Sequence, residues 1–322
     1  MPTLRQLEYI VALADTGQFV EAARRCAVSQ PALSKQVREV EEMLGLKLFE
    51  RVRPRVVVTP AGEEVVRRAR LLLVGARELV NAARTFAGAR RGTIRLGVIP
   101  TVAPYALPGL LVKLRERFPE VSFAIRELQT EVLLEHLRAG EIDLALLARP
   151  FIDEGLSGAD LVVEPFVLVA PTGHPLCVPG MIQPHELDGA SLILMEDGHC
   201  LRDQAIEVCA AAGKPPPTSV TAASVATLVR MVESGLGATL LPASAIRTEV
   251  RASQGLIARS FGESPPGRTL TLQWRATSPS ASWFIGLGEI LREHYLVIDA
   301  ECPEIAGPRP RIRVLGATAA SS

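Results

Sequence analysis

This chain lacks the features that mark membrane and secreted proteins. Its 322 residues contain no run of eighteen apolar residues, and its start lacks the charged and then apolar layout of a signal peptide. The five cysteines are odd in number and have no framework spacing, which argues against the disulfide scaffold of a secreted domain. We therefore expect a cytoplasmic protein without a membrane partner, in a compartment where a disulfide is transient.

Motifs of common enzyme and metal sites are lacking too. The sequence has no zinc-ligand spacing, no Ser-His-Asp arrangement and no glycine-rich loop that would hold phosphate, so we expect neither a metal nor a cofactor. Net charge is zero, with 35 basic and 35 acidic side chains, but it is unevenly spread. Residues 1–91 carry 16 Lys and Arg against 10 Asp and Glu, and this basic part suggests nucleic-acid binding.

The first sixty residues have the pattern of a winged helix-turn-helix. Two amphipathic helices precede Ser29, a good N-cap, and a third helix follows with Pro31 in its first turn. The apolar and basic stretch 48–59 is typical of a β-hairpin wing. Such a domain offers polar side chains to the DNA grooves and backbone. The expected DNA-binding residues are Gln30, Pro31, Ser34, Lys35, Arg38, Arg51, Arg53 and Arg55. The alternative is a solvated basic surface on an unrelated helical domain.

Residues 61–91 form one long predicted helix with a heptad repeat. Its apolar positions follow one another in steps of four and three residues, the period of a two-stranded coiled coil. These positions are Val65, Ala69, Leu72, Ala76, Leu79, Ala83 and Phe86. The pattern favours a dimer through this helix, and the alternative is packing against the chain's own domain. A dimer would present two recognition helices to a two-fold DNA site.

Residues 92–300 alternate short apolar runs with helical patterns, which predicts an α/β domain with mostly parallel sheets. A last strand (269–275) and helix (282–296) return to the first half of the domain. The result would be two lobes, resembling periplasmic binding proteins, with a cleft where a small ligand or chemical signal acts. Residues 301–322 are rich in Pro, Gly, Ala and Ser, and we expect a disordered tail.

Two cysteines stand in contrasting settings. Cys200 lies at the expected start of a helix beside His199 and Arg202, where the positive helix end favours the thiolate. Cys209 lies on the apolar face of the same helix. Nine residues of helix separate two Cα atoms by about 13 Å, whereas a disulfide needs roughly 4.4 to 6.8 Å. If these sulfurs join, the helix must unwind, as a redox switch requires.

The alternative reading is that Cys200 is a small hydrophobic core residue. This is also the role that we expect for the remaining three cysteines, Cys26, Cys177 and Cys302.

The N-terminal motifs resemble those of the LysR-type transcriptional regulators. They are Phe19-x-x-Ala22-Ala23, Ser29-Gln30-Pro31-Ala32-Leu33-Ser34, Leu44-Gly45, Leu48-Phe49-x-Arg51 and Thr59-x-Ala61-Gly62. The resemblance implies a DNA-binding regulator rather than an enzyme, with double-stranded promoter DNA and RNA polymerase as partners. It also implies that the third helix faces the major groove.

The second half resembles the peroxide-sensing branch of this family. The matching motifs are Ile99-Pro100-Thr101-Val102-x-Pro104-Tyr105, Gln129-Thr130, Glu196-Asp197-Gly198-His199-Cys200-Leu201-Arg202-Asp203-Gln204, Cys209 and Thr239-Leu240-Leu241-Pro242. The resemblance implies that hydrogen peroxide oxidises Cys200, which then forms a reversible disulfide with Cys209. A dimer of dimers and a reducing system such as glutaredoxin or thioredoxin are implied as well. The implied peroxide pocket consists of Thr101, Thr130, His199, Arg202, Asp203 and Arg268.

Two other functions remain open at this point. The cleft of a LysR-type regulator could sense a small metabolite, with Cys200 not redox-active. A thiol peroxidase that consumes peroxide catalytically is the third hypothesis, and the predicted DNA-binding module argues against it.

Overall fold

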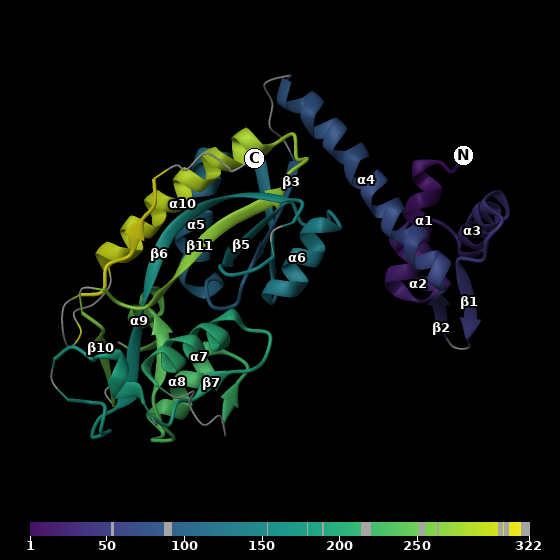
Figure 1. Cartoon of the computed structure of the whole chain (residues 1–322). Coiled ribbons are helices and arrows are strands. Elements are labelled where there is room, and N and C mark those ends of the chain that lie inside the picture. The colour runs from purple at the N-terminus through teal and green to yellow at the C-terminus, as the bar shows by residue number, and fades with distance from the viewer. Residues whose placement is uncertain are drawn as a thin grey trace. The chain divides into compact units, whose positions relative to one another are not determined.

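The computed structural model describes residues 1–52, 55–86, 92–152, 154–178, 180–188, 190–213, 220–250, 255–262, 264–301, 305 and 309–316. The chain consists of two compact units, Met1–Arg90 and Arg91–Ser322. Figure 1 shows the secondary structure of each. Our predictions for Arg53 and Cys302 lie outside the described residues.

The first unit is a winged helix-turn-helix, as predicted. Thr3 caps the first helix in a capping box with Gln6. The Ser29 hydroxyl caps the third helix, the predicted recognition helix, by accepting from the Ala32 N–H. The elements are α1 (Leu4–Thr16), α2 (Phe19–Arg25), α3 (Gln30–Leu44), β1 (Phe49–Val52), β2 (Arg55–Val58) and α4 (Pro60–Phe86). Strands β1 and β2 pair antiparallel and form the wing.

A single buried carboxylate joins the recognition helix to the wing. Glu41 of α3 accepts hydrogen bonds from the backbone N–H groups of Leu48 (2.9 Å) and Phe49 (3.3 Å), and from Lys47 Nζ (2.8 Å). Burial alone would raise the pKa of this carboxyl, but the three donors hold it below its usual range. The wing is therefore fixed to α3 through Glu41.

Helix α4 packs against its own unit near its start, where the predicted heptad positions Val65 and Ala69 join the core, and it exposes apolar side chains further along. Val66 and Ala69 are buried in the core of the first unit. Further along, the predicted heptad positions Leu72 and Leu79 are 59% and 73% exposed. Large aliphatic side chains at this exposure leave an apolar surface of the kind that a coiled-coil partner covers.

The second unit is an α/β domain with two lobes that share strand β6 (Leu156–Pro171). The first lobe contains β3 (Gly92–Val98), α5 (Ala103–Arg117), β4 (Val121–Glu127), α6 (Thr130–Arg138), β5 (Leu144–Ala148), β11 (Gly267–Arg275) and α10 (Ala281–Glu301). The second lobe contains the 3₁₀ helix η1 (Pro184–Leu187), β7 (Leu194–Met195), α7 (Cys200–Ala212), β8 (Thr221–Ala222), α8 (Val225–Glu233), β9 (Thr239–Pro242), α9 (Ala243–Glu249) and β10 (Leu256–Ser260).

The expectation of mostly parallel sheets is wrong. Strand β3 pairs in parallel with β4 and β5, but β6 pairs antiparallel with β9, β10 and β11. Residues 156–165 of β6 pair with β11, and residues 166–171 pair with β9 and β10. One strand thus passes through both lobes. An apolar run reveals that a strand is buried but not in which direction it runs.

Part of the C-terminal tail is ordered, contrary to our prediction. Strand β12 (Arg313–Val314) pairs antiparallel with Val162 and Val163 of β6, and the Leu315 N–H donates to the Leu161 carbonyl. Ile312 is 4% exposed. The alternation of apolar Ile312 and Val314 with arginines is the pattern of a strand that covers a sheet edge. The expectation of disorder was based on the Pro, Gly, Ala and Ser content of the tail, which does not reveal this alternation.

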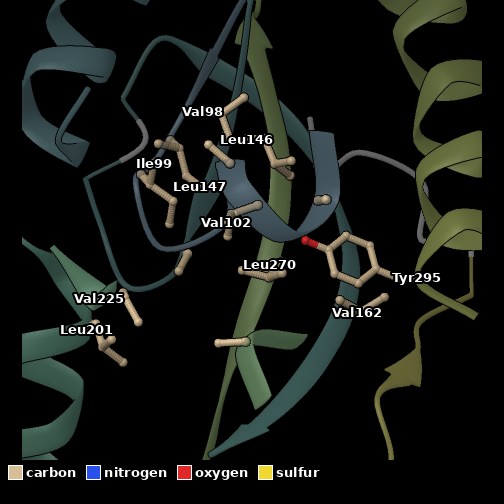
Figure 2. Packing of buried hydrophobic residues seen from close by; sticks show 14 of the residues in the cluster. Val98, Ile99, Val102, Leu146, Leu147, Val162, Leu201, Val225, Leu270 and Tyr295 are labelled. Atoms are coloured by element: carbon tan, nitrogen blue, oxygen red, sulfur yellow. The ribbon is translucent and has the colours of Figure 1, made fainter. Parts of the chain in front are cut away.

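Two hydrophobic clusters fill the second unit. The main cluster combines β3, β5, β6 and β11 with α5 and α10, and it extends to Leu201 of α7 and Val225 of α8. Figure 2 shows these two side chains and the ring of Tyr295, which enters the cluster from α10. A smaller cluster, called here the Cys209 cluster, consists of Leu168, Ala170, Ile182, Leu187, Leu192, Leu194, Ala205, Cys209, Ala238, Leu240 and Phe261.

Candidate functional site

Cys200 is the first residue of α7 and follows a tight turn. Gly198 in this turn has φ +87°, and a Cβ atom there would lie 2.6 Å from Gln129 Oε1. The left-handed backbone favours glycine here, whereas the flexible end of Gln129 could move aside. Gln129 Nε2 in turn donates to the Asp197 carbonyl at 3.4 Å. The turn before Cys200 is thereby packed against the start of α6 in the other lobe.

The thiol of Cys200 lies between both lobes, beside Thr101, Thr130 and Arg268. Burial raises its pKa, while Arg268, the hydroxyls of Thr130 and Thr101, and the Leu201 N–H act in the opposite direction. We expected the helix N-terminus to favour the thiolate. Instead the thiol is favoured, because the effect of burial on the pKa is larger than the effect of the helix N-terminus. Of the two arginines named from the sequence, Arg268 is the cation beside this sulfur and Arg202 is not.

Arg268 is fixed by hydrogen bonds in the fully buried interior. Its Nη1 donates to Thr101 Oγ1 at 2.7 Å and its Nη2 to the Thr101 carbonyl at 3.0 Å. Its Nε donates to Glu164 Oε2 at 2.9 Å. Burial opposes the charge of Arg268, but Glu164 and Cys200 outweigh it and raise the pKa of the guanidinium. Arg268 is thus a permanent cation beside Cys200.

The direction of the Arg268–Thr101 bond determines what the Thr101 hydroxyl can do. A guanidinium only donates, so Thr101 Oγ1 accepts from Arg268. Its single proton remains available for an acceptor, and Cys200 is the neighbour whose negative charge it stabilises. Thr130 Oγ1 is buried without a nitrogen or oxygen partner among the described residues, and it too stabilises charge on the Cys200 sulfur. Two hydroxyl donors and one cation therefore face the same sulfur.

The remaining three predicted pocket residues, His199, Arg202 and Asp203, have different surroundings. His199, the N-cap of α7, is 7% exposed, and burial lowers its pKa, so its imidazole is neutral at pH 7. Arg202 supports the turn, because its Nη1 donates to the Met195 carbonyl at 3.1 Å and its Nε pairs with Asp197 at 2.8 Å. Asp203 is exposed in the first turn of α7. The structure thus gathers Thr101, Thr130 and Arg268 around Cys200, but not Asp203.

Cys209 is fully buried in the Cys209 cluster, whereas Cys200 packs against the main cluster. Both are free cysteines. Helix α7 is continuous between them, so their Cα atoms are about 13 Å apart. Burial raises the pKa of Cys209 to about 11. At neutral pH this thiol is protonated and unreactive in its buried position.

Sequence reasoning missed Glu164, which pairs with Arg268. It is 0% exposed, and it lies directly opposite Arg268 in the antiparallel register of β6 and β11. A single carboxylate within the otherwise apolar stretch 161–166 would be costly to bury without a cation, and this was the signal available. That stretch reads Leu161-Val162-Val163-Glu164-Pro165-Phe166.

The predicted DNA-binding residues lie on the first unit. Gln30, Pro31, Lys35 and Arg38 are exposed on α3, Ser34 is half-buried, and Arg55 is exposed on the wing. The side chains of Arg51 and Arg53 lie outside the described part of the structure. The exposed cations and the glutamine share one face of the recognition helix, as a major-groove reader requires.

Among the described residues, no three His, Cys, Asp or Glu side chains are grouped as metal ligands would be. None of the helices within the described ranges combines the length and apolar character needed to cross a bilayer.

Comparison with known proteins agrees with this arrangement. Residues 4–63 match the bacterial regulatory helix-turn-helix protein family of the lysR type, and residues 87–294 match the LysR substrate binding domain. The chain belongs to the LysR family of transcriptional regulators.

Its relatives include proteins named for peroxide. The chain is 40% identical over 293 residues to a probable hydrogen peroxide-inducible genes activator of Streptomyces viridosporus, covering 91% of this chain and 94% of that protein. It is also 40% identical over 293 residues to the regulator EstR of Acinetobacter baylyi, covering 91% and 97%. A structure of OxyR from Corynebacterium glutamicum, a cysteine-to-serine mutant with bound H₂O₂, has a TM-score of 0.66 and 34% identity, covering 94% and 95%.

Proposed function

We propose that this LysR-family regulator senses hydrogen peroxide through Cys200 and Cys209 and changes transcription of oxidative-stress genes in the cytoplasm. The observation that carries the proposal is the pairing of Cys200 with Arg268, Thr101 and Thr130, while Cys209 is buried in a separate cluster. Relatives named as peroxide-inducible activators and an OxyR structure with bound H₂O₂ support it.

The first step is oxidation of Cys200. Burial keeps most of this thiol protonated at neutral pH, so the reacting species is the minority thiolate that Arg268 and the two hydroxyls stabilise. The sulfur attacks one peroxide oxygen, the S–O bond forms as the O–O bond breaks, and the leaving hydroxide takes up a proton to become water. Cys200 becomes a sulfenic acid. Hydroxyl donors such as Thr101 stabilise the negative charge on the leaving oxygen.

The second step joins the two sulfurs. The Cys209 sulfur attacks the Cys200 sulfur, the S–S bond forms, and the S–O bond breaks with loss of water. Because α7 holds the Cα atoms about 13 Å apart, the helix must unwind and Cys209 must leave its cluster. The change is passed to the DNA-binding unit, which contacts promoter DNA through Gln30, Ser34, Lys35 and Arg38, and through Arg51, Arg53 and Arg55 of the wing.

The proposed assembly and partners follow from this role. Dimers form through α4, whose Leu72 and Leu79 are exposed, and two dimers form a tetramer on DNA. RNA polymerase is the partner at the promoter, and glutaredoxin or thioredoxin reduces the disulfide. The protein acts as a regulator rather than as an enzyme.

The test is footprinting of one bound promoter with dithiothreitol and then with a stoichiometric amount of peroxide. We expect wild-type protein to change its footprint and to lose two free thiols, whereas Cys200→Ser and Cys209→Ser keep the reduced footprint. Cys177→Ser is the matched control, because Cys177 is a free, half-buried cysteine of the same lobe. Retention of both thiols in wild-type protein would contradict the proposal.

A second candidate function is metabolite sensing with Cys200 not redox-active. A groove of about 530 Å³ between the lobes favours it, and its lining includes Arg149, Phe166, Gln204, Pro266, Arg268 and Thr269. The similarity to EstR, whose name does not refer to peroxide, also leaves this function open. A Cys200→Ser variant with an unaltered peroxide response in a promoter assay would favour this candidate.

A further inference from the structure

Glu164 is a buried carboxylate for which the steps above give no role. It lies on β6 at 0% exposure, in the segment that connects the two lobes. Both of its oxygens have partners. Oε2 accepts from Arg268 Nε at 2.9 Å and pairs with Nη2 at 2.9 Å, and Oε1 accepts from the Ser244 N–H at 3.0 Å.

These bonds fix Arg268 in one orientation. Arg268 Nε donates to Glu164, and the two terminal nitrogens of the guanidinium lie against Thr101. Of these, Nη1 donates to Thr101 Oγ1. A planar guanidinium cannot rotate its donors independently, so the position of one edge determines the other. The orientation of the Thr101 hydroxyl next to Cys200 therefore depends on Glu164.

We propose that Glu164 is a positioning residue for the reaction of Cys200 with peroxide. It holds Arg268 against Thr101, so that Thr101 accepts from the guanidinium and directs its only proton to the sulfur or to the attacked peroxide. This inference rests on the proposed function, because it assigns Glu164 a role in that reaction.

Two possible roles of Glu164, as a negative charge or as a positioning residue, predict opposite changes in the stability of the Cys200 thiolate when Glu164 is replaced. If the carboxylate acted only through its negative charge, its removal would leave Arg268 less neutralised, and the Cys200 thiolate would become more favourable. If it positions Arg268, its removal lets the guanidinium shift and the thiolate loses its cation and its hydroxyl donor. The direction in which the pH profile moves distinguishes the two roles.

The experiment uses the full-length protein and two variants of Glu164. Glu164→Gln removes the charge and turns an NH₂ group toward either Arg268 or the Ser244 N–H. Glu164→Asp keeps the charge but is one methylene too short to reach both partners. The readouts are the rate of Cys200 oxidation by hydrogen peroxide and the pH profile of iodoacetamide alkylation, each followed on the Cys200 peptide by mass spectrometry.

We expect both variants to react with peroxide at least about tenfold more slowly at pH 7, the effect of losing one charge-assisted hydrogen bond. The midpoint of the alkylation profile should move to higher pH. A faster reaction with a lower midpoint in Glu164→Gln, or a wild-type rate in Glu164→Asp, would overturn the proposal. Should Glu164→Gln fail to fold, Glu164→Asp decides.

Asp143→Asn is the matched control. Asp143 accepts from the Arg95 backbone N–H (2.9 Å), Nε (3.0 Å) and Nη2 (2.5 Å) in the same lobe, and none of these contacts involves Thr101 or Arg268. It should lose stability but keep the Cys200 profile. If Glu164→Gln and Asp143→Asn give the same wild-type profile, the inference fails. If wild-type Cys200 is not oxidised at all, the proposed function fails instead.

Discussion

Cys200 and Cys209 lie on one continuous helix, but their side chains pack against different hydrophobic clusters. Helix α7 thus connects the Cys200 thiol, between the lobes, to a thiol in the core of the second lobe. The two sulfurs cannot join while this helix is intact.

The first prediction concerns the helix. Treatment of wild-type protein with a stoichiometric amount of peroxide should increase amide hydrogen exchange over residues 200–212, because disulfide formation unwinds α7. Hydrogen-exchange mass spectrometry checks this, with Cys209→Ser as the control that keeps its protection. Unaltered exchange in oxidised wild-type protein, with the disulfide present, would show that the sulfurs join without unwinding.

The second prediction concerns alkaline pH. Burial raises the pKa of Cys209 to about 11 from an ordinary value of 9.0. The folded state therefore holds its proton more tightly, and the stabilisation is complete below about pH 9 and is lost as the pH rises towards 11. We expect the free energy of unfolding to fall by about 2 kcal/mol over this range, as measured by urea unfolding of reduced protein. Cys209→Ala should show a smaller fall, and an equal fall would contradict the assignment.

The third prediction concerns the buried pair of Arg268 and Glu164. Arg268→Met leaves a carboxylate without its cation at 0% exposure, and breaking such a pair costs about 3–5 kcal/mol. The double variant Arg268→Met, Glu164→Gln removes both charges and should recover much of this stability in urea unfolding. It should not recover peroxide reactivity, because Cys200 still lacks its cation. Recovery of the rate as well would show that Arg268 has no part in the reaction.

The fourth prediction concerns DNA. Lys35 and Arg38 are exposed on α3, and replacement of either by Ala should weaken binding to promoter DNA. If the lost contact is to a phosphate, the slope of log affinity against log salt should decrease by about 1. Fluorescence anisotropy at several salt concentrations measures both quantities. Arg67→Ala on α4, where Arg67 pairs with Glu64, is the control and should leave the slope unchanged.

The fifth prediction concerns the C-terminal strand. Deletion of residues 309–322 removes β12 and exposes the edge of β6 next to Val162 and Val163. Loss of the buried Ile312 side chain alone should cost about 1.5–3 kcal/mol, seen as a lower melting temperature. Deletion of residues 317–322 is the control and should leave stability unchanged. An equal melting temperature in both would mean that β12 does not stabilise the domain.

The sequence was sufficient to predict the local features of the fold. Helix caps at Ser29 and the apolar face of α7 are patterns within a few residues, and the predicted helices there match α3 and α7. The α/β class followed from the alternation of apolar runs with helical patterns, and the two lobes followed from the last strand and helix that return to the first half. Strand direction did not follow, and Glu164 and Pro165 interrupt the apolar pattern of β6, which hides the full length of this strand.

The family resemblance named Thr101, Thr130 and Arg268 as pocket residues, but the contacts among them required the structure. Thr101 and Arg268 are 167 positions apart, and Glu164 and Arg268 are 104 apart. No local pattern indicates which arginine will meet which carboxylate across strands so distant in the chain. The direction of the Cys200 pKa shift could not be predicted either, because the residues that bury this thiol and those that stabilise its charge are far apart in the chain.

The packing of Cys209 also makes the proposed transition self-reversing. When its side chain departs, it leaves a void lined by aliphatic groups such as Leu168 and Leu240, and a dry void of that kind costs free energy that water does not relieve. In the proposed oxidised state, the molecule would store this free energy for as long as the disulfide lasts. Under the proposed mechanism, once a reductant cleaves the sulfur–sulfur bond, filling of the void would favour the return of the chain to its reduced conformation.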